Sequence, residues 1–99
     1  MEISAAESIN TALIALVPRR LEELRMRSQL AATYVHKLTG INIRRIERGL
    51  VDPTLRTLTL VLNVYGYTLF DFFFELQEVV LRRRLAEQQQ QTDSLNRRI

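Results

Sequence analysis

The sequence predicts an all-α protein with one core. Three glycines and two prolines are spread over 99 residues, and the segments between them are long enough for helices. Inside these segments apolar residues recur every three or four positions rather than every second one, which is the spacing of a helix that buries one face. We therefore expect five or six helices and no sheet. A chain of this length supports a single domain.

The first expected helix covers residues 1–17. Ser4 or Ser8 can cap its start, since a serine hydroxyl accepts a hydrogen bond from a free amide of the first turn. The helix should stop before Pro18, because proline disfavours helical backbone in the residue before it. A second helix then begins with Pro18 in its first turn. Amides at this position have no hydrogen-bond partner within the helix, so the amide hydrogen that proline lacks is not missed there.

Short-range signals place three further helices. Between Ser28 and Arg48 we expect two short helices around a tight turn, the second closed by Gly49 as a C-cap. The run Asp52-Pro53-Thr54 predicts the start of the next helix, and Gly66 predicts its end.

The last expected helix starts after Thr68, a good N-cap, and carries more apolar residues than one face can bury in so small a domain. The surplus predicts a dimer interface formed by Phe72, Phe73, Leu76 and Val80. Residues 75–99 extend this helix into a polar tail. The coiled-coil spacing of seven residues relates Phe74, Leu81, Gln88 and Leu95.

The composition is that of a folded, soluble protein, with 46% hydrophobic and 25% charged residues. Without cysteine there is no disulfide, thiolate metal site or cysteine nucleophile, which suits the reducing cytoplasm. Glu2 and Glu7 stand where a secretory signal carries basic residues, and no apolar run reaches the roughly 20 residues that span a bilayer. We expect a cytoplasmic protein with no membrane partner.

Positive charge is concentrated in the middle of the chain. The net charge is +3, but the segment from Arg19 to Arg56 alone holds nine basic and four acidic residues, a local excess of +5. The segment before it is acidic, and the segment after it is balanced. Such a field suits a polyanion such as nucleic acid.

Three motifs carry a resemblance to a known family. They are Ile43-x-x-Ile46-Glu47-Arg48-Gly49, Asp52-Pro53-Thr54-Leu55-x-Thr57-Leu58 and Val64-Tyr65-Gly66-Tyr67-Thr68-Leu69-Phe70-Asp71. With these motifs, residues 18–74 resemble the xenobiotic-response-element family, the helix-turn-helix regulators of the Cro and phage-repressor type. The resemblance implies a five-helix repressor-like DNA-binding domain, here with an added N-terminal helix and an extended C-terminal helix. In this fold a recognition helix enters the major groove of DNA.

The position of the turn stays open at this point, because two alignments to the family compete. In the first, Gln29 belongs to the opening of the second helix, Lys37 replaces the usual turn glycine, and Thr39 caps a recognition helix from Gly40 to Arg48. In the second, Thr39-Gly40-Ile41 is the turn, and Asn42 caps a recognition helix about three residues shorter. The first alignment favours DNA binding. The second leaves only a short recognition helix and therefore favours binding to a protein partner.

Both alignments place Asn42, Arg44 and Arg45 near the DNA-facing side, because Ile43 and Ile46 must point inward. Arginine can hold guanine by two hydrogen bonds or clamp a phosphate, and asparagine can bond adenine. The resemblance adds Gln29 as an anchor on the phosphate backbone. The remaining candidates for DNA contact are Thr39, Gly40, Ile41 and Arg48.

No motif points to an enzyme. The resemblance implies that Glu47 pairs with an arginine or caps backbone near Gly49, and the single histidine, His36, lacks companions for a metal site. We expect no catalytic residue, no cofactor and no metal.

The expected function is that of a sequence-specific DNA-binding transcriptional regulator, a repressor or autoregulator that binds duplex DNA as a homodimer. The alternative is a protein-interaction module or antitoxin with a degenerate helix-turn-helix, which binds a protein partner through its C-terminal helix.

Overall fold

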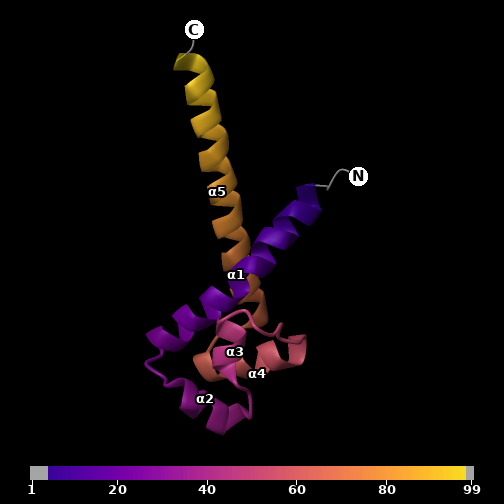
Figure 1. The fold of residues 1–99 in the computed structure, drawn as a ribbon, viewed down its shortest axis with the longest axis vertical. Coiled ribbons are helices and arrows are strands. Elements are labelled where there is room, and N and C mark those ends of the chain that lie inside the picture. The colour runs from indigo at the N-terminus through magenta and orange to yellow at the C-terminus, as the bar shows by residue number, and fades with distance from the viewer. Residues whose placement is uncertain (1–4, 98–99) are drawn as a thin grey trace.

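The computed structural model describes the backbone of residues 5–97 and the side chains of residues 6–90, and it contains helices and no strand within that range. The all-α prediction is confirmed. The elements are α1 (Ala5–Arg27), α2 (Ala32–Thr39), α3 (Ile43–Glu47), α4 (Leu55–Tyr65) and α5 (Leu69–Arg97). The three short helices gather at one end of the molecule, and the long helices α1 and α5 cross beside them and diverge toward the termini (Figure 1).

Helix α1 does not stop at Pro18, as the sequence analysis predicted, but runs through it without a break. Proline has no amide hydrogen to donate to the carbonyl of Ile14, so the helix continues at the cost of one hydrogen bond. Burial outweighs that loss, since Val17 and Leu21 on either side of the proline are 6% and 0% exposed. The two expected helices are therefore one, and Ser4 as a cap lies outside the described residues.

All five helices contribute to one core. The largest fully buried side chains include one from each helix in turn, namely Leu21, Val35, Ile43, Leu62 and Phe72. Ile43 and Ile46 both point inward, as their spacing predicted. Because each helix gives at least one residue to the same cluster, the short α2 and α3 are held by packing rather than by their own propensity.

The predicted start and end of α4 and the predicted cap of α5 are confirmed. The Thr54 hydroxyl accepts a hydrogen bond from the Thr57 amide at 3.1 Å, and the Thr68 hydroxyl accepts one from the Asp71 amide at 3.1 Å. Gly66 ends α4 in the left-handed conformation, with φ of 73°. These caps turn the chain by 95° between α4 and α5 and so bring α5 back along α1.

Three of the four residues predicted to form a dimer interface belong to the core of the chain itself. Phe72, Leu76 and Val80 are 0%, 3% and 4% exposed. Phe73 is partly buried against that core, edge-on to Phe72 with ring centroids 5.3 Å apart. The sequence gives no sign that α1 covers this face. Among the described side chains of α5, the large apolar ones that are exposed are Phe70, Phe74, Val79, Leu81 and Leu85.

Candidate nucleic-acid interface

The turn between α2 and α3 lies at Thr39-Gly40-Ile41, where the second of the two alignments placed it. Lys37 and Leu38, the turn of the first alignment, are inside α2. Gly40 follows α2 with φ of 75°, and its amide donates to the carbonyl of His36 at 2.7 Å. A left-handed residue at this place is the usual end of a helix, and glycine adopts it without steric strain.

Thr39 secures the end of α2 rather than the start of a recognition helix. Its hydroxyl donates to the carbonyl of Val35 at 2.7 Å and accepts a hydrogen bond from the amide of Ile41 at 3.1 Å. Ile41 is partly buried and packs against the core. Neither residue is placed as the first alignment required for contact with a base.

The second helix of the motif, α3, has five residues. Asn42 stands at its N-cap position but makes no capping hydrogen bond with its side chain, which is exposed. At the other end Gly49 adopts φ of 72°, and the amide of Leu50 donates to the carbonyl of Arg45 at 2.9 Å. The helix therefore has little more than one turn, and backbone hydrogen bonds close its C-terminal end.

Gln29 does not open the second helix. It lies in the turn between α1 and α2 with φ of 57°, and among the described residues it is the one with positive φ that is not a glycine. Helix α2 begins three residues later, after Ala31. The Gln29 side chain is exposed, so contact with a phosphate is open to it, but not as the cap of α2.

A buried ion-pair network fixes α3 against α1. The Glu47 side chain is 0% exposed and accepts two hydrogen bonds from Arg25, from Nε at 2.7 Å and from Nη2 at 3.1 Å. Arg25 also donates to the carbonyl of Leu30 at 2.9 Å. The hydrogen bonds with Glu47 raise the pKa of Arg25 although burial opposes this. The expected pairing of Glu47 with an arginine is thus present.

Arg44 belongs to the same network, which limits the contacts that its side chain can make with a ligand. Its Nη1 lies 2.9 Å from Glu47 Oε1 and 3.0 Å from Glu22 Oε2. Two carboxylates thus hold one guanidinium nitrogen in place, and the side chain is 40% exposed. Arg45 and Arg48 are exposed, so they are the arginines of this segment that are presented to a ligand.

Tyr65 lies beside this network with a buried hydroxyl that finds no hydrogen-bond partner among the described residues. Burial, reinforced by the negative charge of Glu47, raises its pKa to about 12. The hydroxyl therefore stays neutral at physiological pH.

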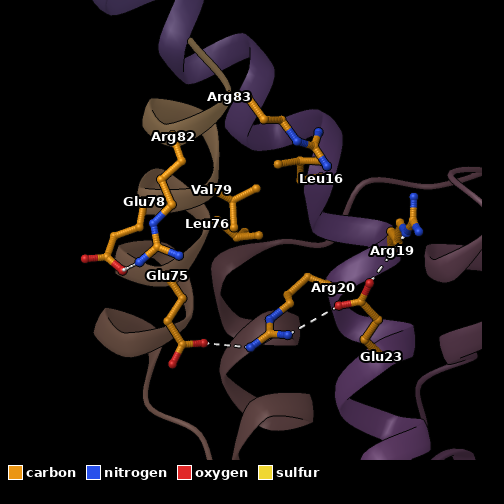
Figure 2. Close-up of a pocket in the computed structure, with 10 residues that line it drawn as sticks. All are labelled: Leu16, Arg19, Arg20, Glu23, Glu75, Leu76, Glu78, Val79, Arg82 and Arg83. Carbon is orange, nitrogen blue, oxygen red and sulfur yellow. Dashed lines mark hydrogen bonds and ion pairs between the residues drawn. The ribbon is translucent and has the colours of Figure 1, made fainter. Parts of the chain in front are cut away.

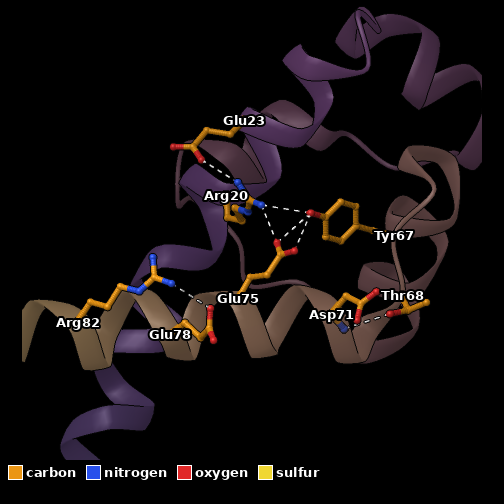
Figure 3. A network of polar contacts seen from close by, with 8 residues as sticks. All are labelled: Arg20, Glu23, Tyr67, Thr68, Asp71, Glu75, Glu78 and Arg82. Atoms are coloured by element: carbon orange, nitrogen blue, oxygen red, sulfur yellow. Dashed lines mark hydrogen bonds and ion pairs between the residues drawn. The ribbon is translucent and has the colours of Figure 1, made fainter.

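A second polar network, which the sequence analysis missed, joins α1 to α5 (Figure 3). Arg20 donates through Nη2 to Glu75 Oε2 at 2.7 Å and to the Tyr67 hydroxyl at 3.3 Å. Burial would raise the pKa of Glu75, but the hydrogen bonds from Arg20 and Tyr67 outweigh it and lower that pKa. Arg20 and Glu75 are 55 residues apart in the chain, so no local signal could pair them.

The same residues line a polar groove between α1 and α5 (Figure 2). Its lining includes Arg20 and Glu75 together with Arg19, Arg82 and Arg83. Each carboxylate drawn in Figure 2 contacts an arginine of this chain, Glu78 through Arg82 at 3.5 Å. The carboxylates that line the groove are therefore paired within the chain, and these ion pairs contribute to the packing of α5 on α1.

Comparison of the chain with protein-family models, with curated proteins and with solved structures finds no match. The resemblance to the Cro and phage-repressor type therefore rests on the residues that carry it.

The part of the chain that the structure describes shows neither a metal-binding cluster nor a single membrane-spanning helix. No group of three or more histidine, cysteine, aspartate or glutamate side chains there could hold a metal ion. No single helix in that range is long and apolar enough to cross a membrane, although α4 and the first part of α5, bent by 95°, are long and apolar enough when taken together.

Proposed function

We propose that the chain is a helix-turn-helix regulator that binds duplex DNA mainly through the phosphate backbone and reads few bases. The observation that carries this proposal is the pair of exposed arginines, Arg45 in the short helix α3 and Arg48 directly after it, where buried contacts hold the helix in place. They stand within the segment whose local charge is +5. Arginines on a rigid support and a local positive field are what phosphate binding requires.

The short α3 is the reason for weak base reading. A recognition helix reads bases with side chains from its N-terminal turns, and α3 offers five residues of which Ile43, Ile46 and Glu47 are buried. Gly40 has no side chain to contribute. Base contacts are thus limited to Asn42 and Arg45, and much of any sequence preference would come from DNA shape.

The test is a fluorescence-anisotropy titration of duplex DNA from the gene's own upstream region, beside a scrambled duplex, at two salt concentrations. The variant is Arg45→Ala/Arg48→Ala. Its matched control is Arg82→Ala/Arg83→Ala, which removes the same charge from exposed positions on α5.

We expect salt-sensitive binding that the first double variant weakens by about tenfold or more, with the salt slope reduced by about two. The control should change affinity much less, and the scrambled duplex should bind only moderately more weakly. Equal loss in both double variants would mean that net charge alone attracts the DNA, and no binding by the native chain would end the proposal.

A protein-interaction module is the second candidate, and two observations favour it. One is the length of α3. The other is the apolar groove at the start of α5, lined by Leu13, Leu69, Phe70, Phe73, Phe74 and Gln77. Phe70 and Phe74 stack there with ring centroids 5.8 Å apart and are 75% and 49% exposed. A protein bound at this groove would lose affinity on Phe70→Ser/Phe74→Ser and keep it on Arg45→Ala/Arg48→Ala.

A further inference from the structure

The polar groove between α1 and α5 also has an apolar wall. Leu16 of α1 and Leu76 and Val79 of α5 line it together with the charged residues. Leu76 is 3% exposed and belongs to the core, whereas Val79 is 37% exposed, so part of the wall faces solvent. The groove has a volume of about 390 Å³, which falls within the roughly 300–1,000 Å³ of sites for small organic molecules.

Positive charge exceeds negative charge in this groove by one. The charged residues of its lining are four arginines and three glutamates, namely Arg19, Arg20, Arg82, Arg83, Glu23, Glu75 and Glu78. Arg20 is fully engaged, because its two terminal nitrogens donate to Glu23, Tyr67 and Glu75. Each glutamate is bound to an arginine of the chain. The excess of positive charge therefore lies on the three remaining arginines.

These three arginines have most of their N–H groups unpaired among the described residues. Arg83 makes no hydrogen bond or ion pair there, and its side chain extends toward Leu16 of α1, on the lining of the same groove (Figure 2). Arg19 reaches Glu23 through Nε alone and Arg82 reaches Glu78 through Nη2 alone, each at 3.5 Å. A guanidinium has five N–H groups, so donors remain for a ligand in the groove.

Unpaired guanidinium groups beside an apolar wall are complementary to one kind of molecule. A carboxylate matches the N–H fork of arginine, and an aliphatic body removes the apolar wall from water. A phosphate of the DNA backbone offers the first feature without the second, because it carries no aliphatic body to lie on Leu16 and Val79. The excess of one positive charge corresponds to a ligand with a single carboxylate.

We propose that this groove binds a small organic anion, a monocarboxylate with an aliphatic body. Arg83 holds the carboxylate, and the body packs on Leu16 and Val79. The ligand joins the two long helices, since Arg83 and Val79 belong to α5 and Leu16 belongs to α1. Because the arginines at the groove are exposed, we expect a dissociation constant on the order of 0.1–1 mM. The site involves neither α3 nor Arg45, so it holds or fails independently of the proposed DNA binding.

The first test is a titration of the isotope-labelled chain with octanoate, followed by NMR. We expect saturable shifts of the amide signals around Leu16 in α1 and around Val79 and Arg83 in α5. Signals at Phe70 and Phe74, which line the separate apolar groove, should stay nearly in place. Shifts concentrated at Phe70 and Phe74, or no saturable shift at all, would overturn the proposal.

Two further ligands separate the charge from the apolar body. Acetate carries the carboxylate without the body, and octanol carries the body without the charge. Each should bind at least about tenfold more weakly than octanoate, because each lacks one of the two contacts. If octanol bound as tightly as octanoate, apolar surface alone would account for binding, and if acetate did so, charge alone would. Either result would contradict a site that recognises both parts of the ligand.

The second test removes the arginine that is assigned to the carboxylate. Arg83→Gln should raise the dissociation constant of octanoate by about tenfold or more, since a charge-assisted hydrogen bond is lost. Folding should be unaffected, because Arg83 is exposed, and the same NMR spectra check this. The matched control, Arg56→Gln, removes the same charge from an exposed position on α4 and should leave the constant nearly unchanged. Equal affinity of Arg83→Gln and the native chain would exclude Arg83 as the binding group and overturn the proposal.

Discussion

Arg25 of α1 and Glu47 of α3 form a two-point ion pair, with Nε and Nη2 of the arginine 2.7 Å and 3.1 Å from the two carboxylate oxygens. The side chains are 8% and 0% exposed. The pair links α3, the shortest of the described helices, to α1. Its carboxylate, that of Glu47, also contacts Arg44. The rigidity of the proposed DNA-binding surface depends on this contact.

Replacing Glu47 with glutamine should therefore destabilise the fold strongly. The change leaves Arg25 buried without its counter-ion, and removal of one partner of a buried pair costs about 3–5 kcal/mol. Urea unfolding of Glu47→Gln measures the loss. Glu23→Gln is the control, because that side chain is 46% exposed in its pairs with Arg19 and Arg20 and should cost less than about 1 kcal/mol. Similar small losses in both variants would show that the buried pair does not hold α3.

Gly40→Ala tests where the turn lies, because the two alignments predict opposite signs. A Cβ at Gly40 meets no atom within 4 Å, so only the φ of 75° opposes it. An L-residue held in this conformation costs about 1–2 kcal/mol. We expect thermal unfolding to show that loss, with Gly40→Asn less affected. If Gly40 were inside a recognition helix, alanine would instead stabilise the protein by about 0.5–1 kcal/mol.

Pro18→Ala should stabilise the protein, because α1 runs through this position. Alanine restores the amide that proline lacks and removes the clash with the preceding turn, an effect of up to about 3 kcal/mol inside a helix. Thermal denaturation followed by circular dichroism measures the change. If Pro18 stood in the first turn of a separate helix, the substitution would be neutral or harmful, and that outcome would contradict the continuous α1.

Tyr65 should make the protein sensitive to alkali. Because burial raises the pKa of Tyr65 from 10.0 to about 12, the unfolded chain loses this proton before the folded one does. The contribution to stability is present below pH 10 and is lost as the pH rises toward about 12.

Tyr65→Phe should remove that part of the alkaline decline, as urea unfolding at neutral and alkaline pH can measure. At neutral pH the variant should be as stable as the native chain or more so, since it removes a buried hydroxyl without a partner. Tyr34→Phe is the control, because that ring is 47% exposed. An alkaline decline that persists in Tyr65→Phe would place its origin elsewhere.

Local signals determined most of the secondary structure. Thr54, Thr68 and Gly66 act within a few residues of their own positions, through hydrogen bonds to nearby amides and through backbone conformation. The inward side of α3 followed in the same way from the spacing of Ile43 and Ile46. Such features can be read from the sequence because the atoms that produce them are close along the chain.

The candidate site was only partly predictable. Asn42, Arg45 and Arg48 are exposed on or beside α3, where they can meet a ligand. Arg44 is different, since carboxylates from two helices engage it, and one of them, Glu22, lies 22 residues away. The two alignments also stayed open on sequence alone, because Lys37 and Gly40 can each be fitted to a turn, and the left-handed backbone at Gly40 decides between them.

Other features depend on contacts between distant parts of the chain, and only the tertiary structure decided them. Helix α1 continues through Pro18, and the packing of α5 against it buries Phe72, Leu76 and Val80 rather than Phe70, Phe74, Leu81 and Leu85. The sequence determined that α5 has more apolar surface than one face can bury. Which of its faces meets the core depends on its contacts with α1, such as that of Glu75 with Arg20, which lies 55 residues earlier in the chain.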